Sequence, residues 1–148
     1  MTEHRRENAA KQFLQRYRAM MQRRESLQRS IDEAYERATS CTQHIKAVNV
    51  MSSGSGDRMA EDVIKVADST EQLRAVIRQI DAELKEILEA INSIPDEMQK
   101  TILTLRYIEG LDWLKIADNT GYEVVSIYKY HGRGLWNVEK WMKEYRKV

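Results

Sequence analysis

Apolar residues recur along the first two thirds of the chain at alternating steps of four and three, in two separate series. The first series is Phe13, Tyr17, Met20, Arg24, Leu27, Ile31, Ala34, Ala38, Cys41, Ile45 and Val48. The second series is Met59, Val63, Val66, Thr70, Leu73, Ile77, Ile80, Leu84, Ile87, Ile91 and Ile94. A period of 3.5 residues held this long is typical of a coiled-coil seam. The pattern predicts two long helices whose seams are apolar except at Arg24.

The two series are separated by "SSGSG" at residues 52–56, which is too flexible to continue a helix, and by Asp57, a good helix N-cap. We therefore expect residues 1–94 to form a long antiparallel coiled-coil hairpin with its turn at about residues 50–57. The predicted register sets Phe13 opposite Ile94, Leu27 opposite Ile80 and Ala38 opposite Thr70. This register also places Arg24 beside Glu83, so pattern and charge agree.

The hairpin has two interpretations, a spacer or an oligomerisation element. A second apolar stripe, made of Leu14 and Met21 with Leu88 level with them, widens the apolar face near the base of the hairpin. Either a second hairpin or the C-terminal part of the chain could dock there.

Residues 95–148 predict a separate domain of three shorter helices. Ser93 is expected to cap the first helix, with Pro95 in its first turn and Asp96 completing a capping box. Gly110 is a natural C′ residue at the end of this helix. These signals mark a short helix that ends just before a tight turn.

A second turn signal follows closely. Asp112 is expected to cap a short helix over residues 113–119, and Gly121 supplies a positive-φ turn. A final helix is predicted from about Glu123 to the end of the chain. The residues expected to face the core are Leu114, Ile116 and Ala117 on the short helix, and Val124, Ile127, Leu135, Val138 and Trp141 on the final helix. Two helices joined in this way predict a helix-turn-helix.

The C-terminal part resembles region 4 of bacterial sigma factors, the module that reads the −35 promoter element. The matching landmarks are Pro95, "LRYIEG" at 105–110, "KIA" at 115–117, Gly121, Ile127, Arg133 and Leu135. With "SSGSGDRMAEDV" and "YHGRGL" (130–135), the whole chain is similar to phage and prophage late-gene regulators of the ArpU and RinA type. The resemblance implies an all-α protein, a coiled-coil hairpin followed by a sigma region-4-like helix-turn-helix, that regulates phage or mobile-element genes.

The resemblance also implies which residues contact DNA. Base-facing positions of region 4 match Val124, Val125, Tyr128 and Lys129, and Tyr130 and Arg133 follow them. Glu123 stands where the family usually has Ser or Thr, and it could accept from cytosine N4 or repel phosphate.

The valines make contact with thymine methyls as plausible as hydrogen-bonded readout. Cations of the final helix and the rings among them favour contact with a phosphate backbone. These residues are Lys129, Arg133, Lys140, Lys143, Arg146 and Lys147, with Tyr128, Tyr130 and His131. Lys140 to Lys147 could equally form a solvated helix end.

Gly132 and Gly134 each cost roughly 1 kcal/mol relative to alanine inside a helix, so two within one turn need a reason. Close approach to the preceding helix or to the DNA backbone would supply one, and a kink is the alternative.

Charge and composition exclude several other classes. The net charge is +1, but residues 1–29 carry +5, residues 30–95 carry −5 and residues 123–148 carry +3. The opposite charges of the first two zones suggest that they pair with each other. A single cysteine, a charged N-terminus and the lack of any long apolar run fit the cytoplasm of a bacterial host cell. His4, His44, His131 and Cys41 are too scattered to assemble a metal site.

The sequence also shows no phosphate loop and no catalytic set, so we expect no enzyme, no cofactor and no small-molecule substrate. The expected partners are double-stranded DNA, a second copy of the chain through the hairpin, in a homodimer or small oligomer, and, as a further candidate, host RNA polymerase. Nothing resembles the sigma segment that melts DNA, so initiation by this chain alone is not expected. The alternative functions are a small-terminase-like subunit that recognises DNA for packaging, and a helical adaptor that binds only protein.

Overall fold

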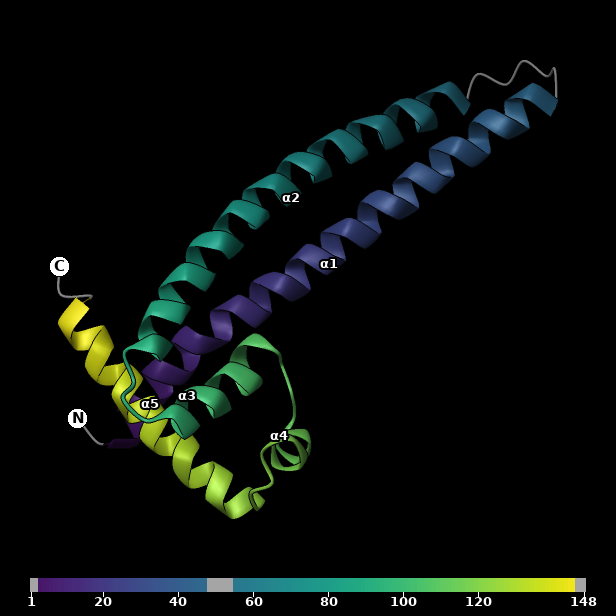
Figure 1. The fold of residues 1–148 in the computed structure, drawn as a ribbon. Coiled ribbons are helices and arrows are strands. Elements are labelled where there is room, and N and C mark those ends of the chain that lie inside the picture. Colours follow the sequence, from purple (N-terminus) through teal and green to yellow (C-terminus); the bar gives the residue numbers. More distant parts are fainter. Residues whose placement is uncertain (1–2, 48–54, 146–148) are drawn as a thin grey trace. The chain divides into compact units, whose positions relative to one another are not determined.

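The computed structural model describes the backbone of residues 3–47 and 55–145, and the side chains of residues 9–40 and 58–145 (Figure 1). The described elements are α1 (Glu3–Ala47), α2 (Ser55–Asn92), α3 (Glu97–Leu103), the π-helical turn η1 (Thr104–Ile108), α4 (Trp113–Thr120) and α5 (Val124–Tyr145). All of them are helical, which confirms the predicted all-α class. None of the described helices is long and apolar enough to cross a membrane.

The predicted turn at about residues 50–57 falls mostly on residues 48–54, outside the described part of the chain. The side chains of Cys41, Ile45 and Asp57 lie outside it too. Helix α2 begins at Ser55, which places Asp57 within its first turn. The prediction that Asp57 caps this helix is therefore wrong.

Packing divides the chain into two compact units that do not follow the sequence order. Unit 1 joins Met1–Ala19 to Ile80–Val148, and unit 2 is Met20–Gln79. The main buried cluster of unit 1 consists of Ala10, Phe13, Leu14, Ile87, Ala90, Ile91, Ile94, Leu103, Tyr107, Leu135, Val138 and Trp141. This core draws on both sides of the domain boundary predicted between residues 94 and 95.

The start of α1 is a central part of the unit 1 core. The ring of Phe13 stacks on Trp141 of α5 with 5.9 Å between ring centroids. Leu14 is completely buried in the same cluster. Of the two partners considered for the stripe around Leu14, the C-terminal part of the chain is the one that packs there.

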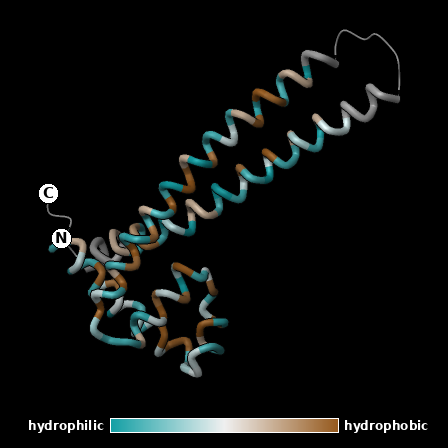
Figure 2. Tube along the Cα trace, turned by 45° about the horizontal axis from the view of Figure 1, so that its top comes forward, coloured by the Kyte–Doolittle hydropathy of each residue, from teal (hydrophilic) through white to brown (hydrophobic). Residues whose placement is uncertain are grey.

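In unit 2 the predicted seam is only partly covered. Ala34 of α1 and Val76 of α2 are buried, whereas Val63 is 57% exposed and Ile77 is 39% exposed. Figure 2 shows hydrophilic positions dominating both α1 and α2, with apolar positions interrupting them. Helix α1 covers the side of α2 that contains Val76, and Val63 and Ile77 lie about 100–140° further round the helix. The predicted places of Val63 and Ile77 in the covered seam are therefore wrong.

Ion pairs within each unit reveal the register of α1 against α2. In unit 2, Arg37 Nε lies 3.7 Å from Asp62 Oδ1, although the predicted register sets the neighbouring Ala38 opposite Thr70. In unit 1, Arg16 Nη1 lies 4.0 Å from Glu83 Oε1, so Arg16 takes the place predicted for Arg24. The predicted register is thus wrong by about one heptad. A heptad pattern superposes on itself after such a shift, so apolar spacing alone does not choose between the two registers.

The connection from α2 to α3 also differs from the prediction. Asp96, not Ser93, is the N-cap of α3, and its carboxylate accepts a hydrogen bond of 3.0 Å from the Gln99 N–H. Ser93 Oγ instead donates to the Ala90 carbonyl at the end of α2. Pro95 disfavours helical backbone at the residue before it, so the helix start moves past the proline.

Candidate nucleic-acid interface

Helices α4 and α5 are joined by a tight turn whose signals the sequence carries. The Asp112 carboxylate caps α4 by accepting from the Lys115 N–H at 2.9 Å. Gly110 and Gly121 have φ of +74° and +73°, a conformation that favours glycine. Helix α5 follows with the Glu123 carbonyl accepting from the Ile127 N–H at 3.1 Å. The predicted caps and turns of this segment are confirmed.

The undersides of α4 and α5 meet over a small apolar cluster. Ile102 of α3, Ile116 of α4 and Ile127 of α5 are completely buried, and Ala117 packs against them. Leu114 is 70% exposed, so its predicted place in the core is wrong. Residues 113, 116, 117 and 120 share one face of the short helix, and position 114 points away from that face.

The outward face of α5 carries most of the residues predicted to contact DNA. Val125, Tyr128, Lys129 and Arg133 are exposed, as is Glu123 at the start of the helix, and Val124 is half-buried. Val125 is 64%, Tyr128 is 50% and Trp136 is 56% exposed, so large apolar side chains are grouped on this side of the helix. Cationic and apolar side chains thus share one accessible surface, which we call the α5 face: Val125, Tyr128, Lys129, Arg133 and Trp136.

Two residues predicted among the surface cations lie elsewhere. Tyr130 is half-buried against the cluster beneath α4, and its ring meets Tyr122 edge-on at 5.7 Å. His131 is buried, and its Nε2 shares a hydrogen bond of 2.7 Å with the Tyr107 hydroxyl. Both follow Ile127 on the inner side of α5, so the prediction of an outward His131 is wrong.

Burial dominates the chemistry of this hydrogen-bonded pair. Burial, with a smaller contribution from the positive charges of Lys11 and Arg106, lowers the pKa of His131 to about 4. Burial also raises the pKa of Tyr107 to about 12, which Arg106 opposes. At neutral pH both groups are therefore uncharged, as a buried hydrogen bond inside unit 1 requires.

An aromatic brace holds the ring of Tyr128 on the α5 face. Trp113 of α4 contacts Tyr128 edge-on with 5.0 Å between centroids, and His131 edge-on at 4.8 Å. The guanidinium of Arg106 lies 4.4 Å from the centroid of the same indole. Such contacts restrict the rotamers of Tyr128, so less conformational freedom is lost when its ring meets a ligand.

Arg106 is placed by a backbone feature that the sequence does not signal. The π-helical turn η1 extends the end of α3, with Glu109 N–H donating to the Thr104 carbonyl at 3.1 Å. Arg106 Nη1 then donates to the Leu111 carbonyl at 3.1 Å. Turns of this kind occur frequently at functional sites.

The two glycines of α5 have different surroundings. A Cβ added at Gly134 would lie 3.0 Å from Leu103 Cδ1, so Gly134 permits the close approach of α5 to α3. Apart from its two chain neighbours and the local backbone of α5, no atom of the described residues would lie within 4 Å of a Cβ at Gly132. Internal packing therefore explains Gly134 but not Gly132, which lies next to Arg133.

Sequence reasoning missed Trp136. Its side chain is 56% exposed, and Lys140 Nζ lies 5.7 Å from its ring centroid. Its spacing from Val125 and Lys129, eleven and seven residues, places it on the α5 face and is the signal that could have found it.

Of the remaining predicted cations, Lys143 pairs with Glu139 at 3.6 Å. Arg146 and Lys147 lie outside the described residues.

A scan against protein-family models and searches of curated proteins and of solved structures gave no match to this chain. Within the described residues, no group of three or more His, Cys, Asp or Glu side chains could hold a metal ion. The side chains of His4, His44 and Cys41 lie outside that part of the chain. Any function assigned to the chain thus depends on the geometry of the α5 face and the residues that support it.

Proposed function

We propose that this protein is a sequence-specific DNA-binding regulator of transcription that inserts the start of α5 into the major groove. The observation that carries the proposal is the α5 face, where Lys129 and Arg133 stand exposed beside Val125 and Tyr128. The opposite side of α5 is sealed by Ile127 against α3 and α4. A helix anchored on one side and accessible on the other fits the major groove, and its cations can contact the phosphates.

The likeness of "LRYIEG", "KIA" and "YHGRGL" to sigma region 4 and to phage late-gene regulators supports the biological setting. In this proposal the protein acts in a bacterial cytoplasm on genes of a phage or mobile element. Host RNA polymerase is the proposed partner at the promoter. Helix α4 would cross the DNA backbone, with exposed Lys115 facing the phosphates.

The first test removes the two cations of the α5 face. Replacing Lys129 and Arg133 together with alanine should weaken binding to a duplex selected from a random library by roughly 10- to 100-fold. Each lost phosphate contact should also lower the slope of log affinity against log salt by about 1. Fluorescence anisotropy over a series of salt concentrations measures both quantities.

The control variant replaces Lys65 and Lys85 with alanine. Both lysines are exposed on α2, and their loss changes the net charge equally without touching the α5 face. If both variants lost the same affinity for the duplex, the loss would be explained by the overall charge of the protein and not by the α5 face. Unchanged binding by the Lys129 and Arg133 variant would reject the placement of α5 in the groove.

The apolar character of the α5 face also defines how bases are read. Val125 offers methyl groups and no hydrogen-bonding side chain, so its natural contact in the groove is the thymine methyl group. Replacing thymine by uracil in the selected duplex should weaken binding about fourfold for each methyl group that is contacted. The Val125→Ala variant should be less sensitive to this replacement. Equal affinity for thymine and uracil duplexes would show that bases are read through hydrogen bonds instead.

A packaging subunit of the small-terminase type and a protein-only adaptor are the competing functions. The packaging subunit would bind a packaging site rather than promoters, and it would form rings of many copies. The adaptor would show no salt-dependent affinity for any duplex. Genomic footprinting of the tagged protein in its host distinguishes the transcription regulator from the packaging subunit, because promoters and a packaging site give different peaks.

A further inference from the structure

Unit 2 exposes an apolar row on α2 that α1 does not cover. Val63, Ile64 and Ile77 are 57%, 60% and 39% exposed, and Val63 and Ile77 lie two heptads apart on one face of the helix. Single exposed apolar residues are ordinary, but a row of them along a helix marks a contact surface.

The seam between α1 and α2 in unit 2 is itself incompletely buried. Leu27 and Ile31 of α1, and Val66 and Leu73 of α2, are only half-buried, although they belong to the apolar series that defines the hairpin. Each fully buried Leu, Ile or Val side chain contributes roughly 1.5–3 kcal/mol. The two helices of unit 2 thus leave apolar surface exposed to water, and a four-helix arrangement would bury it.

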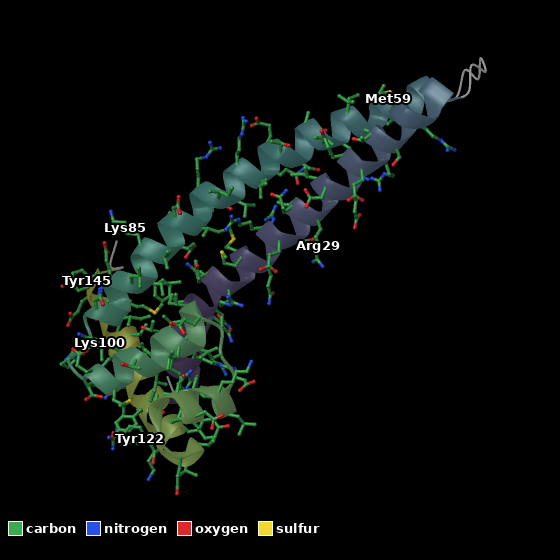
Figure 3. All side chains as sticks on the ribbon, turned by 45° about the vertical axis from the view of Figure 1, so that its right-hand side comes forward. Arg29, Met59, Lys85, Lys100, Tyr122 and Tyr145 are labelled. Carbon is green, nitrogen blue, oxygen red and sulfur yellow. The ribbon has the colours of Figure 1, made fainter. Side chains whose placement is uncertain are left out.

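The charges of unit 2 identify the occupant of this surface. The Arg37–Asp62 ion pair sets residue 30 of α1 level with residue 69 of α2. The half at residues 20–30 and 69–79 carries Arg23, Arg24, Arg29, Arg74 and Arg78 against Glu25 and Glu71. The half at residues 31–40 and 58–68 carries Asp32, Glu33, Glu36, Glu61, Asp62 and Asp68 against Arg37, Arg58 and Lys65. The net charges of these two halves are +3 and −3. Arg29 and Met59, labelled in Figure 3, lie in the basic and the acidic half respectively.

We propose that unit 2 pairs with unit 2 of a second copy of this chain in an antiparallel, two-fold symmetric dimer. A two-fold axis level with residues 30 and 69 sets the basic half of each copy against the acidic half of the other. The same operation brings the two rows that contain Val63 and Ile77 together in the centre of a four-helix bundle. A parallel pairing would set like charges against each other, and a duplex would be repelled by the acidic half.

Sedimentation equilibrium of the full chain tests the proposal. The expected mass is twice the 17.4 kDa of one chain at micromolar concentration. The dimer should weaken as salt is raised, because opposite charges face each other across the interface. A parallel dimer would instead tighten with salt, and that result would overturn the proposal. A monomer at all concentrations, or a ring of many copies, would overturn it too.

Substitutions on the exposed row give a second test. Replacing Val63 and Ile77 together with glutamate should weaken the dimer by at least roughly tenfold, since unpaired charges would be buried at its centre. Both side chains are accessible in one chain, so helicity measured by circular dichroism should be retained. The control is Leu114→Glu, at an exposed leucine of unit 1 outside the proposed interface. A double variant that dimerises as the parent does would overturn the proposal, whatever the outcome for DNA binding.

Discussion

Replacing Leu14 with alanine is expected to lower the free energy of unfolding by roughly 2–5 kcal/mol. Leu14 lies on the first helix, yet it is completely buried in the core that holds Leu135 and Trp141 of α5. Removing three side-chain carbons there costs their transfer free energy and leaves a cavity. Urea unfolding followed by circular dichroism measures the change from the shift in midpoint at constant slope.

The matched control is Leu114→Ala. The same atoms are removed from a side chain that is 70% exposed, so the free energy of unfolding should change by no more than about 0.5 kcal/mol. Comparable losses in the two variants would contradict the placement of the α1 start in the unit 1 core. The same packing predicts that a fragment of residues 95–148 lacks about half of the main cluster and does not fold independently.

The second large effect is a loss of stability at mildly acidic pH. The pKa of His131 is about 4 in the folded protein against 6.5 for an unperturbed histidine, so the unfolded chain binds the proton more readily. The contribution of neutral His131 is fully present above pH 6.5 and is lost as pH falls towards 4. The difference of the two pKa values corresponds to a loss of up to about 3 kcal/mol. Urea unfolding at intervals between pH 4.5 and 7.5 measures it.

The variant His131→Gln isolates this contribution from that of the carboxylates. A glutamine amide can still reach Tyr107 but does not titrate, so the variant should lose less stability than the parent between pH 6.5 and 4.5. Parallel pH profiles for the two proteins would show that His131 is accessible to protons when folded. Protection of His131 also matters for the site, since its ring supports Trp113 beneath Tyr128.

Local signals in the sequence predicted local structure well. Asp112, Gly110 and Gly121 each act through their own side chain or backbone angle, and the helix ends follow from them. The register of α1 against α2 could not be predicted in the same way. Arg16 and Arg24 are both spaced to meet Glu83, and only the packing around the hairpin selects Arg16. The Ser93 cap failed because Pro95 disfavours helical backbone before it, and Asp96 offers the same capping chemistry just after the proline.

The candidate site shows the same division. Exposure of Val125, Lys129 and Arg133 follows from the 3.6-residue period of α5 once Ile127 is placed in the core. The brace of Trp113 and Arg106 depends on the π-helical turn, and no residue type in "TLRYI" marks such a turn. His131 resembled a surface residue because its partner, Tyr107, lies 24 positions away.

The stacking of Phe13 on Trp141 has a consequence for how the chain acquires its structure during synthesis. Trp141, the aromatic partner of Phe13, is added to the growing chain more than a hundred residues after Phe13. At about 5–20 residues per second, the part of the core around Phe13 and Leu14 that α5 supplies is missing for roughly 6–26 seconds. The nascent chain therefore exposes part of this apolar surface, to which chaperones can bind, until α5 has been synthesised. A messenger truncated before that point would yield a product prone to aggregation rather than a smaller working protein.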